Sequence, residues 1–215
     1  MTDHRRPADA RTLAVTAGWR LLIVACGLIG VIGAVQGREL AGALSELSQQ
    51  ASLATAAIYL GLFAYPFVTG RRFHEPRTPW WRGALAVTLI VVMVVYAALL
   101  DTDYSTTHSQ FEHVITPVLV TVDLLVVGRN LLNVTWWSVL GWLAFPLAYL
   151  VYYNVADLDA YDIPLKVGDG DFFVYFPVLL VATLLVAAVL VGVGRARARS
   201  GGQQLAQHPA EQQPS

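Results

Sequence analysis

Long apolar runs separated by short polar stretches dominate the pattern of hydrophobic and polar positions along the chain. Six such runs can be counted, and they cover residues 16–35, 48–68, 81–100, 110–128, 135–155 and 172–193. About 20 residues of α-helix cross the hydrocarbon core of a bilayer, so each run is long enough to be a membrane span. The runs lack the alternation that marks a membrane β-barrel. The pattern therefore predicts an all-α integral membrane protein with six transmembrane helices.

The rest of the chain is expected to flank one transmembrane domain over residues 14–195. Residues 1–13 are expected to be a disordered cytoplasmic segment, and residues 196–215 a disordered cytoplasmic tail rich in Gln, Gly and Pro. A cleaved signal peptide is the alternative for the first run, since arginines precede it. No small-residue cleavage site follows Val35, which favours a membrane span.

Composition supports the membrane interpretation. The chain is 56% hydrophobic and 13% charged, whereas a soluble domain has about 25% charged residues. The single cysteine, Cys26, lies inside the first run. One cysteine excludes a disulfide framework, and Cys26 is expected to be a small packing residue.

The signs of the charges alternate from loop to loop. Twelve of the fourteen basic residues flank one set of run ends: Arg5, Arg6, Arg11, Arg20, Arg71, Arg72, Arg77, Arg82, Arg129, Arg195, Arg197 and Arg199. The other loops are acidic and contain Glu39, Glu46, Asp101, Asp103, Asp157, Asp159, Asp162, Asp169 and Asp171. Basic loops stay in the cytoplasm, so both termini are expected to be cytoplasmic in a plasma membrane. The arginines are explained by topology and lipid contact, and they do not suggest nucleic-acid binding.

The fourth run, which contains FEHVITPVLVTVDLL, carries ionisable side chains in an apolar setting. Such residues are costly in a bilayer and usually have a function or a partner. On an α-helix His113, Pro117 and Thr121 share a face, whereas Asp123 lies roughly 15 Å deeper. Asp123 is therefore not expected to pair with His113. It forms either a polar contact between helices or a titrating site.

A row of hydroxyl groups is expected at the same depth as His113. The second run begins LSQQAS, and Ser48, Ser52 and Thr55 fall on one helix face at spacings of four and three residues. A histidine beside a serine can act as a general base for acyl transfer. Hydrogen bonding between helices is the alternative function of these hydroxyls.

Metal and cofactor sites are not expected. The segment LDTDYSTTHSQFEH holds Asp101, Asp103, His108, Glu112 and His113, but its histidines lack the spacing of a zinc-protease helix. The acidic segment DLDAYDIPLKVGDGD lacks the glycine and the closing glutamate of a calcium-binding loop. Phosphate-binding glycine loops and a GxSxG motif are absent from the sequence.

Four segments resemble the bacterial Pr-six-Pr membrane proteins, which are similar to the androgen-induced protein and androgen-dependent TFPI-regulating protein family. They are LSQQASL, HVITPVLVTVDLL, WLAFPLAYLVYYNV and YDIPL. The resemblance implies a bacterial six-span hydrolase of fatty-acid esters with a hydroxyl nucleophile and a histidine. Ser48 stands where the family has a threonine, and His113 matches the histidine. The two asparagines of the family motif are replaced here by Gln49 and Ser52.

Three functions follow from these observations. The first is hydrolysis of lipid-like esters, with Ser48 as nucleophile, His113 as base, and Ser52, Thr55 and Asp123 as supporting polar residues. The second is a non-catalytic six-helix protein that binds a membrane lipid or a protein partner. The third is a small proton-coupled transporter that uses Asp123 and His113 as titrating groups.

Overall fold

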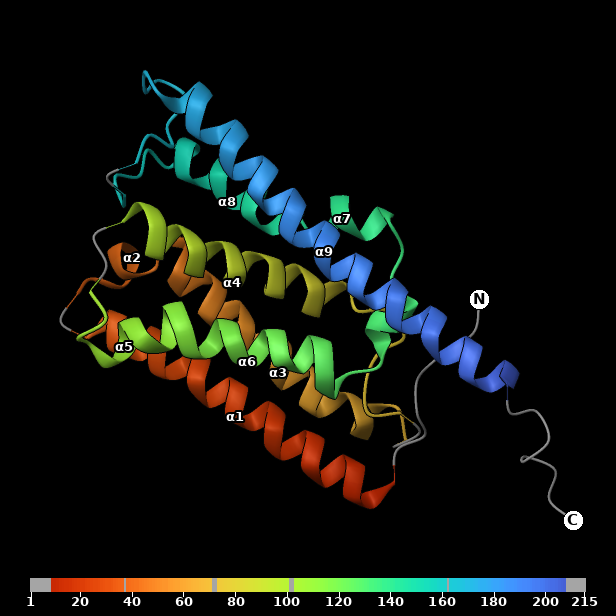
Figure 1. Cartoon of the computed structure of the whole chain (residues 1–215). Coiled ribbons are helices and arrows are strands. Elements are labelled where there is room, and N and C mark those ends of the chain that lie inside the picture. The colour runs from red at the N-terminus through yellow and green to blue at the C-terminus, as the bar shows by residue number, and fades with distance from the viewer. Residues whose placement is uncertain (1–8, 37, 71–72, 101–102, 162, 208–215) are drawn as a thin grey trace, which may run out of the picture.

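The computed structural model describes residues 9–36, 38–70, 73–100, 103–161 and 163–207, and every regular element in these ranges is a helix (Figure 1). Six helical segments are long and apolar enough to cross a membrane: Ala10–Val35, Leu47–Val68, Trp80–Leu99, Thr107–Val127, Trp137–Val155 and Phe172–Ser200. The predicted all-α, six-span architecture is confirmed. Six residues used in the charge argument lie outside the described residues, namely Arg5, Arg6, Arg71, Arg72, Asp101 and Asp162.

Each of the first three spans packs against the next one along the chain. They are α1 (Ala10–Val35), α3 (Leu47–Val68) and α4 (Trp80–Leu99), and the short helix α2 (Leu40–Ala43) joins the first two. Asp9 caps α1 by accepting a hydrogen bond from the Thr12 amide at 2.7 Å. α1 packs along α3 at small residues, and a Cβ atom on Gly27 would lie only 2.8 Å from the Ser52 carbonyl oxygen. This close approach is the packing that small residues permit in membranes.

The fourth span departs from the continuous α-helix expected over residues 110–128. It consists of α5 (Thr107–Gln110), a π-helical turn η1 (Phe111–Ile115), α6 (Thr116–Val122) and a second π-helical turn η2 (Asp123–Val127). Pro117 has no N–H to give to the carbonyl four residues earlier, and its ring crowds that carbonyl. The turn before it is wider, with the Thr116 amide bonded to the Phe111 carbonyl. His113 and Asp123 therefore both lie on π-helical turns, which often occur at functional sites.

The last two spans also differ in detail from the expected boundaries. After the 3₁₀ turn η3 (Asn130–Asn133), the fifth span is divided into α7 (Trp137–Gly141) and α8 (Ala144–Val155). Pro146 cannot donate to the Trp142 carbonyl, which accounts for a break at this point. The sixth span lies in the long helix α9 (Phe172–Gln207), which continues into the segment expected to be a disordered tail. Its alanines, arginines and glutamines favour helix, and residues 208–215 lie outside the described part.

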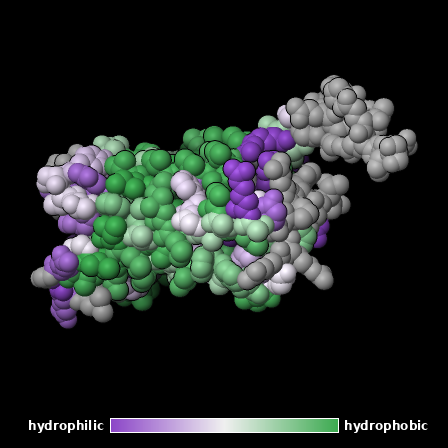
Figure 2. All heavy atoms as spheres, turned by 90° about the horizontal axis from the view of Figure 1, so that it is seen from below, coloured by the Kyte–Doolittle hydropathy of each residue, from purple (hydrophilic) through white to green (hydrophobic). Residues whose placement is uncertain are grey.

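α4 lies at the centre of the bundle, where it contacts α3, α6, α8 and α9. The start of α1 and the end of α9 lie at the same end of the bundle (Figure 1), as an even number of crossings requires. The view in Figure 2 shows a wide apolar band between two polar ends. Trp81, Trp136 and Trp137 are exposed on the surface, as expected for aromatic residues at a membrane boundary.

Candidate functional site

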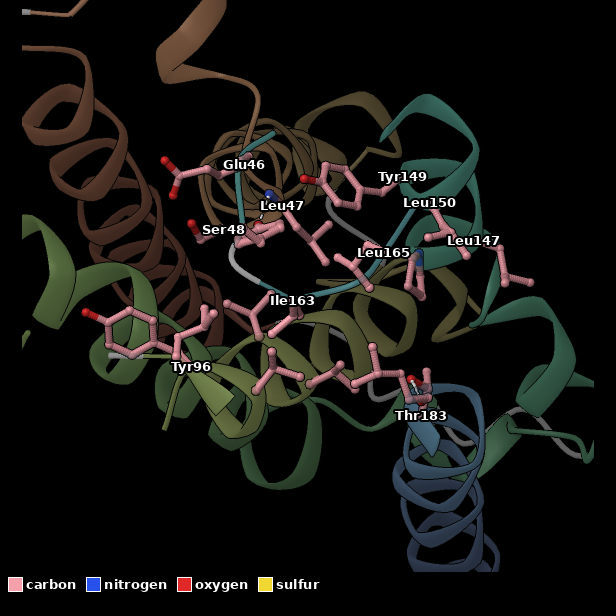
Figure 3. Close-up of a pocket in the computed structure, with 18 of the residues that line it drawn as sticks. Glu46, Leu47, Ser48, Tyr96, Leu147, Tyr149, Leu150, Ile163, Leu165 and Thr183 are labelled. Carbon is pink, nitrogen blue, oxygen red and sulfur yellow. Dashed lines mark hydrogen bonds between the residues drawn. The ribbon is translucent and has the colours of Figure 1, made fainter. Parts of the chain in front are cut away.

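A cavity of about 320 Å³ opens between α4, α8 and α9, at the end of the bundle opposite the start of α1 (Figure 3). Most of its lining is apolar and includes Val92, Val95, Leu147, Leu150, Ile163, Leu165 and Leu179. Polar side chains gather at one end, where Glu46 and Ser48 lie near Tyr96, while Thr183 lies at the other end (Figure 3). An apolar cavity with a few convergent polar groups is typical of a small-molecule site.

Ser48 reaches this cavity from the first turn of α3. Its side chain is buried and lines the polar end. The Leu47 amide just before it donates to the Tyr161 hydroxyl oxygen at 2.7 Å. Burial raises the pKa of the Tyr161 phenol, which keeps this partner neutral. First-turn amides have no acceptor within their helix, and they create a positive potential at Ser48.

His113 lines the same cavity from the turn η1. Its Nδ1 atom lies 3.0 Å from the Ser109 carbonyl oxygen. A carbonyl can only accept a hydrogen bond, so Nδ1 carries the proton and donates it. The other ring nitrogen, Nε2, is then the basic one. The imidazole stacks on the Tyr96 ring, with centroids 3.6 Å apart and planes 12° apart.

A buried carboxyl group stands beside Ser48. Glu112 is 1% exposed, and its Oε2 atom accepts a hydrogen bond from Gln49 Nε2 at 3.2 Å. Ser48 precedes Gln49 in the first turn of α3, so it lies near this carboxyl group. Gly30 of α1 makes room for Glu112, because a Cβ atom there would lie 2.7 Å from the Glu112 Cγ atom. The sequence contained Glu112 as an ionisable residue in an apolar run, but helix pairing was needed to place it next to Ser48.

The other predicted site residues lie elsewhere. Ser52 and Thr55 are fully buried where α3 packs on Gly27 of α1, and they are not among the residues that line the cavity. The Thr55 hydroxyl donates to the Ala51 carbonyl at 2.7 Å. The predicted row of hydroxyls is thus divided, with Ser48 in the cavity and the other two in the contact between α1 and α3.

Asp123 belongs to a separate polar cluster nearer the other end of the bundle. Its Oδ2 atom accepts hydrogen bonds from Tyr59 at 2.7 Å and from Arg82 Nε at 2.8 Å, and its Oδ1 atom accepts one from Trp19 at 2.9 Å. Arg82 also donates to Glu75 at 2.7 Å and to the Asn130 side chain at 2.8 Å. These contacts make Asp123 a polar connection between four spans, because Trp19, Tyr59 and Arg82 come from α1, α3 and α4.

Within the described ranges, no three His, Cys, Asp or Glu side chains gather as metal ligands would.

No family model matches the chain, and no curated protein or solved structure matches it. The resemblance to the Pr-six-Pr proteins therefore stays a prediction.

Proposed function

We propose that this protein is a membrane-embedded hydrolase of lipid-like esters, with Ser48 as nucleophile and His113 as general base. The observation that carries the proposal is that Ser48 and His113, 65 positions apart in the chain, line one apolar cavity. An ester group would bind at the polar end of the cavity, and its acyl chain would pack against the apolar walls. The resemblance to ester-hydrolysing membrane proteins points in the same direction.

The chemistry follows from the groups at the polar end. Ser48 Oγ attacks the ester carbonyl carbon, and its proton passes to Nε2 of His113. The Leu47 amide is bonded to Tyr161, so the Ser48 and Gln49 amides of the first turn of α3 are the ones suited to stabilise the negative oxygen that develops. His113 then returns the proton to the departing alcohol, which leaves an acyl-serine. Water, deprotonated by the same nitrogen, then attacks the acyl-serine. The proton on Nε2 passes to Ser48 Oγ as its bond to the acyl carbon breaks, which releases the fatty acid and free Ser48.

The proposed location is the plasma membrane of a bacterium, with both termini in the cytoplasm. The alternation of basic and acidic loops supports this orientation, and it would place the polar end of the cavity near the outer surface. Cysteine accessibility mapping tests the orientation. A cysteine at Ser105 is expected to react with an impermeant reagent in intact cells, and one at Ser138 only after lysis.

A non-catalytic lipid-binding protein is the second candidate. It is favoured by the geometry at the polar end, because no hydrogen bond joins Ser48 to His113 among the described residues. In this function Ser48 would bind the polar group of a lipid, and the apolar walls would hold its chain.

Labelling with a fluorophosphonate probe separates the two functions. In membranes with equal amounts of each variant, the hydrolase is expected to label in the wild type and to lose labelling in Ser48→Ala and His113→Ala. Ser105→Ala is the matched control, because this exposed serine is joined through Asp103 to Tyr96 beside the cavity, and it should label like the wild type. A folded wild type that does not label would contradict the hydrolase proposal.

A further inference from the structure

A second cavity, of about 220 Å³, lies between α1 and α3, near the start of α1. Its walls are mainly apolar and include Leu13, Ala17, Phe63, Pro66 and Phe67. Arg20 is the only charged side chain among the described residues that line it. This cavity does not share any lining residue with the one that contains Ser48.

Part of the Arg20 guanidinium has a structural role. Pro66 has no N–H, so the Leu62 carbonyl four residues earlier lacks its helical donor. Arg20 Nη1 donates to that carbonyl at 2.7 Å and to the His74 carbonyl at 2.5 Å. Both protons of Nη1 are thereby used, and the carbonyl exposed by the proline is satisfied.

Among the described residues, the opposite edge of the guanidinium has no hydrogen-bond partner. Nε of Arg20 is buried without a hydrogen bond, and no contact of Nη2 is found among the described residues. The whole residue is 2% exposed. No described carboxylate lies within ion-pair distance of it, and the two nearby carboxylates, Glu75 and Asp123, are bonded to Arg82. Leaving a buried charge without a counter-charge is strongly destabilising.

We propose that this cavity binds one anionic phospholipid, with its phosphate on the Nε–Nη2 edge of Arg20 and an acyl chain against Phe63 and Phe67. The Nε–Nη2 edge presents two parallel N–H groups, and this geometry allows bidentate hydrogen bonding to a phosphate. The apolar walls favour a lipid over a free anion, because inorganic phosphate would leave them in contact with water. Arg20 lies one helical turn after Thr16, where the apolar run begins, and so near the depth of lipid headgroups.

Native mass spectrometry of the full chain in detergent tests the proposal, with phosphatidylglycerol and phosphatidylcholine of identical acyl chains as probes. The wild type is expected to bind one phosphatidylglycerol about tenfold more tightly than phosphatidylcholine, because the choline cation offsets the phosphate charge that would pair with Arg20. Arg20→Gln should lose this preference. Because Arg20 also bonds two carbonyls, Ala17→Phe is the second variant: it fills the cavity and leaves those bonds in place. Val15→Phe, on an exposed position of α1 outside the cavity, is the matched control.

The lipid preferences of the wild type and the variants decide the proposal. Preference for the anionic lipid in the wild type and in Val15→Phe, with its loss in Ala17→Phe, supports the proposal. Equal binding of both lipids by the wild type overturns it. An unchanged preference in Ala17→Phe also overturns it, since the lipid would then bind elsewhere. Displacement of the lipid by millimolar inorganic phosphate would show a site for the free anion and would likewise contradict lipid recognition.

Discussion

The imidazole of His113 lies flat on the ring of Tyr96, with centroids 3.6 Å apart. The Tyr96 hydroxyl is held in turn by the Asp103 amide, which donates to it at 2.9 Å, and it lies 3.0 Å from the Ser109 hydroxyl oxygen. The carbonyl of the same Ser109 accepts the Nδ1 proton of His113. Tyr96 thus fixes the plane of the imidazole, while Ser109 fixes which ring nitrogen is basic.

Loss of this stacked ring is expected to slow the proposed chemistry without removing it. Tyr96→Leu should lower the rate of fluorophosphonate labelling at Ser48 by about fivefold, because an aromatic contact of roughly 1 kcal/mol holds the base in place. Tyr96→Phe keeps the stacking surface and should label faster than Tyr96→Leu. Equal rates in the two variants would show that the ring does not position His113.

Removal of one partner from the buried ion pair is expected to destabilise the bundle. Asp123→Ala leaves the Arg82 guanidinium, which is 2% exposed, without one of its two carboxylates. The free energy of unfolding should fall by about 3–5 kcal/mol, measured as a lower thermal midpoint in detergent. The double variant Asp123→Ala with Arg82→Leu should recover part of the loss.

A transporter that titrates Asp123 would instead lose pH-dependent transport in Asp123→Asn while keeping its stability.

The sequence predicted the six spans and the shared depth of Ser48 and His113, because both depend on run length and on the direction of each crossing. It could not predict that Arg82 is the partner of Asp123, since that contact depends on which helices are neighbours. Pro117 marked a disturbance in the fourth span, but only the folded chain shows that it takes the form of a π-helical turn. The lining of the cavity is also a product of packing, because it comes from α3, α4, η1, α8, α9 and the segments 160–161 and 163–165.

Acidification is expected to destabilise the protein through His74, in the loop between α3 and α4. Burial lowers the pKa of His74 from its ordinary value, and so do Arg20 and Arg82, while Glu75 and Asp123 act in the opposite direction. The unfolded chain therefore takes up a proton before the folded chain does as the pH falls below about 6.5. Stability should be full above that pH and should decline below it, down to the lowered pKa.

The measurement is the thermal midpoint in detergent between pH 7.5 and pH 5. His74→Gln removes the titrating group, so its midpoint should change less across this range than that of the wild type. Glu75 and Asp123 are present in both proteins, and their own titration is common to the two curves. Parallel curves would show that His74 does not cause the pH dependence.

The length of the apolar part of the cavity is expected to select the acyl chain of an ester substrate. Thr183 of α9 lies at the end opposite Ser48 (Figure 3), and it is 4% exposed. Thr183→Phe should shorten the space available and lower kcat/KM for long-chain p-nitrophenyl esters by about tenfold relative to short-chain esters, since a few buried CH₂ groups would lose their contacts. Val181→Phe, exposed on the same helix, is the matched control. Thr183 lines the cavity and Val181 does not. If both variants changed the chain-length profile equally, the acyl chain would therefore not occupy this cavity.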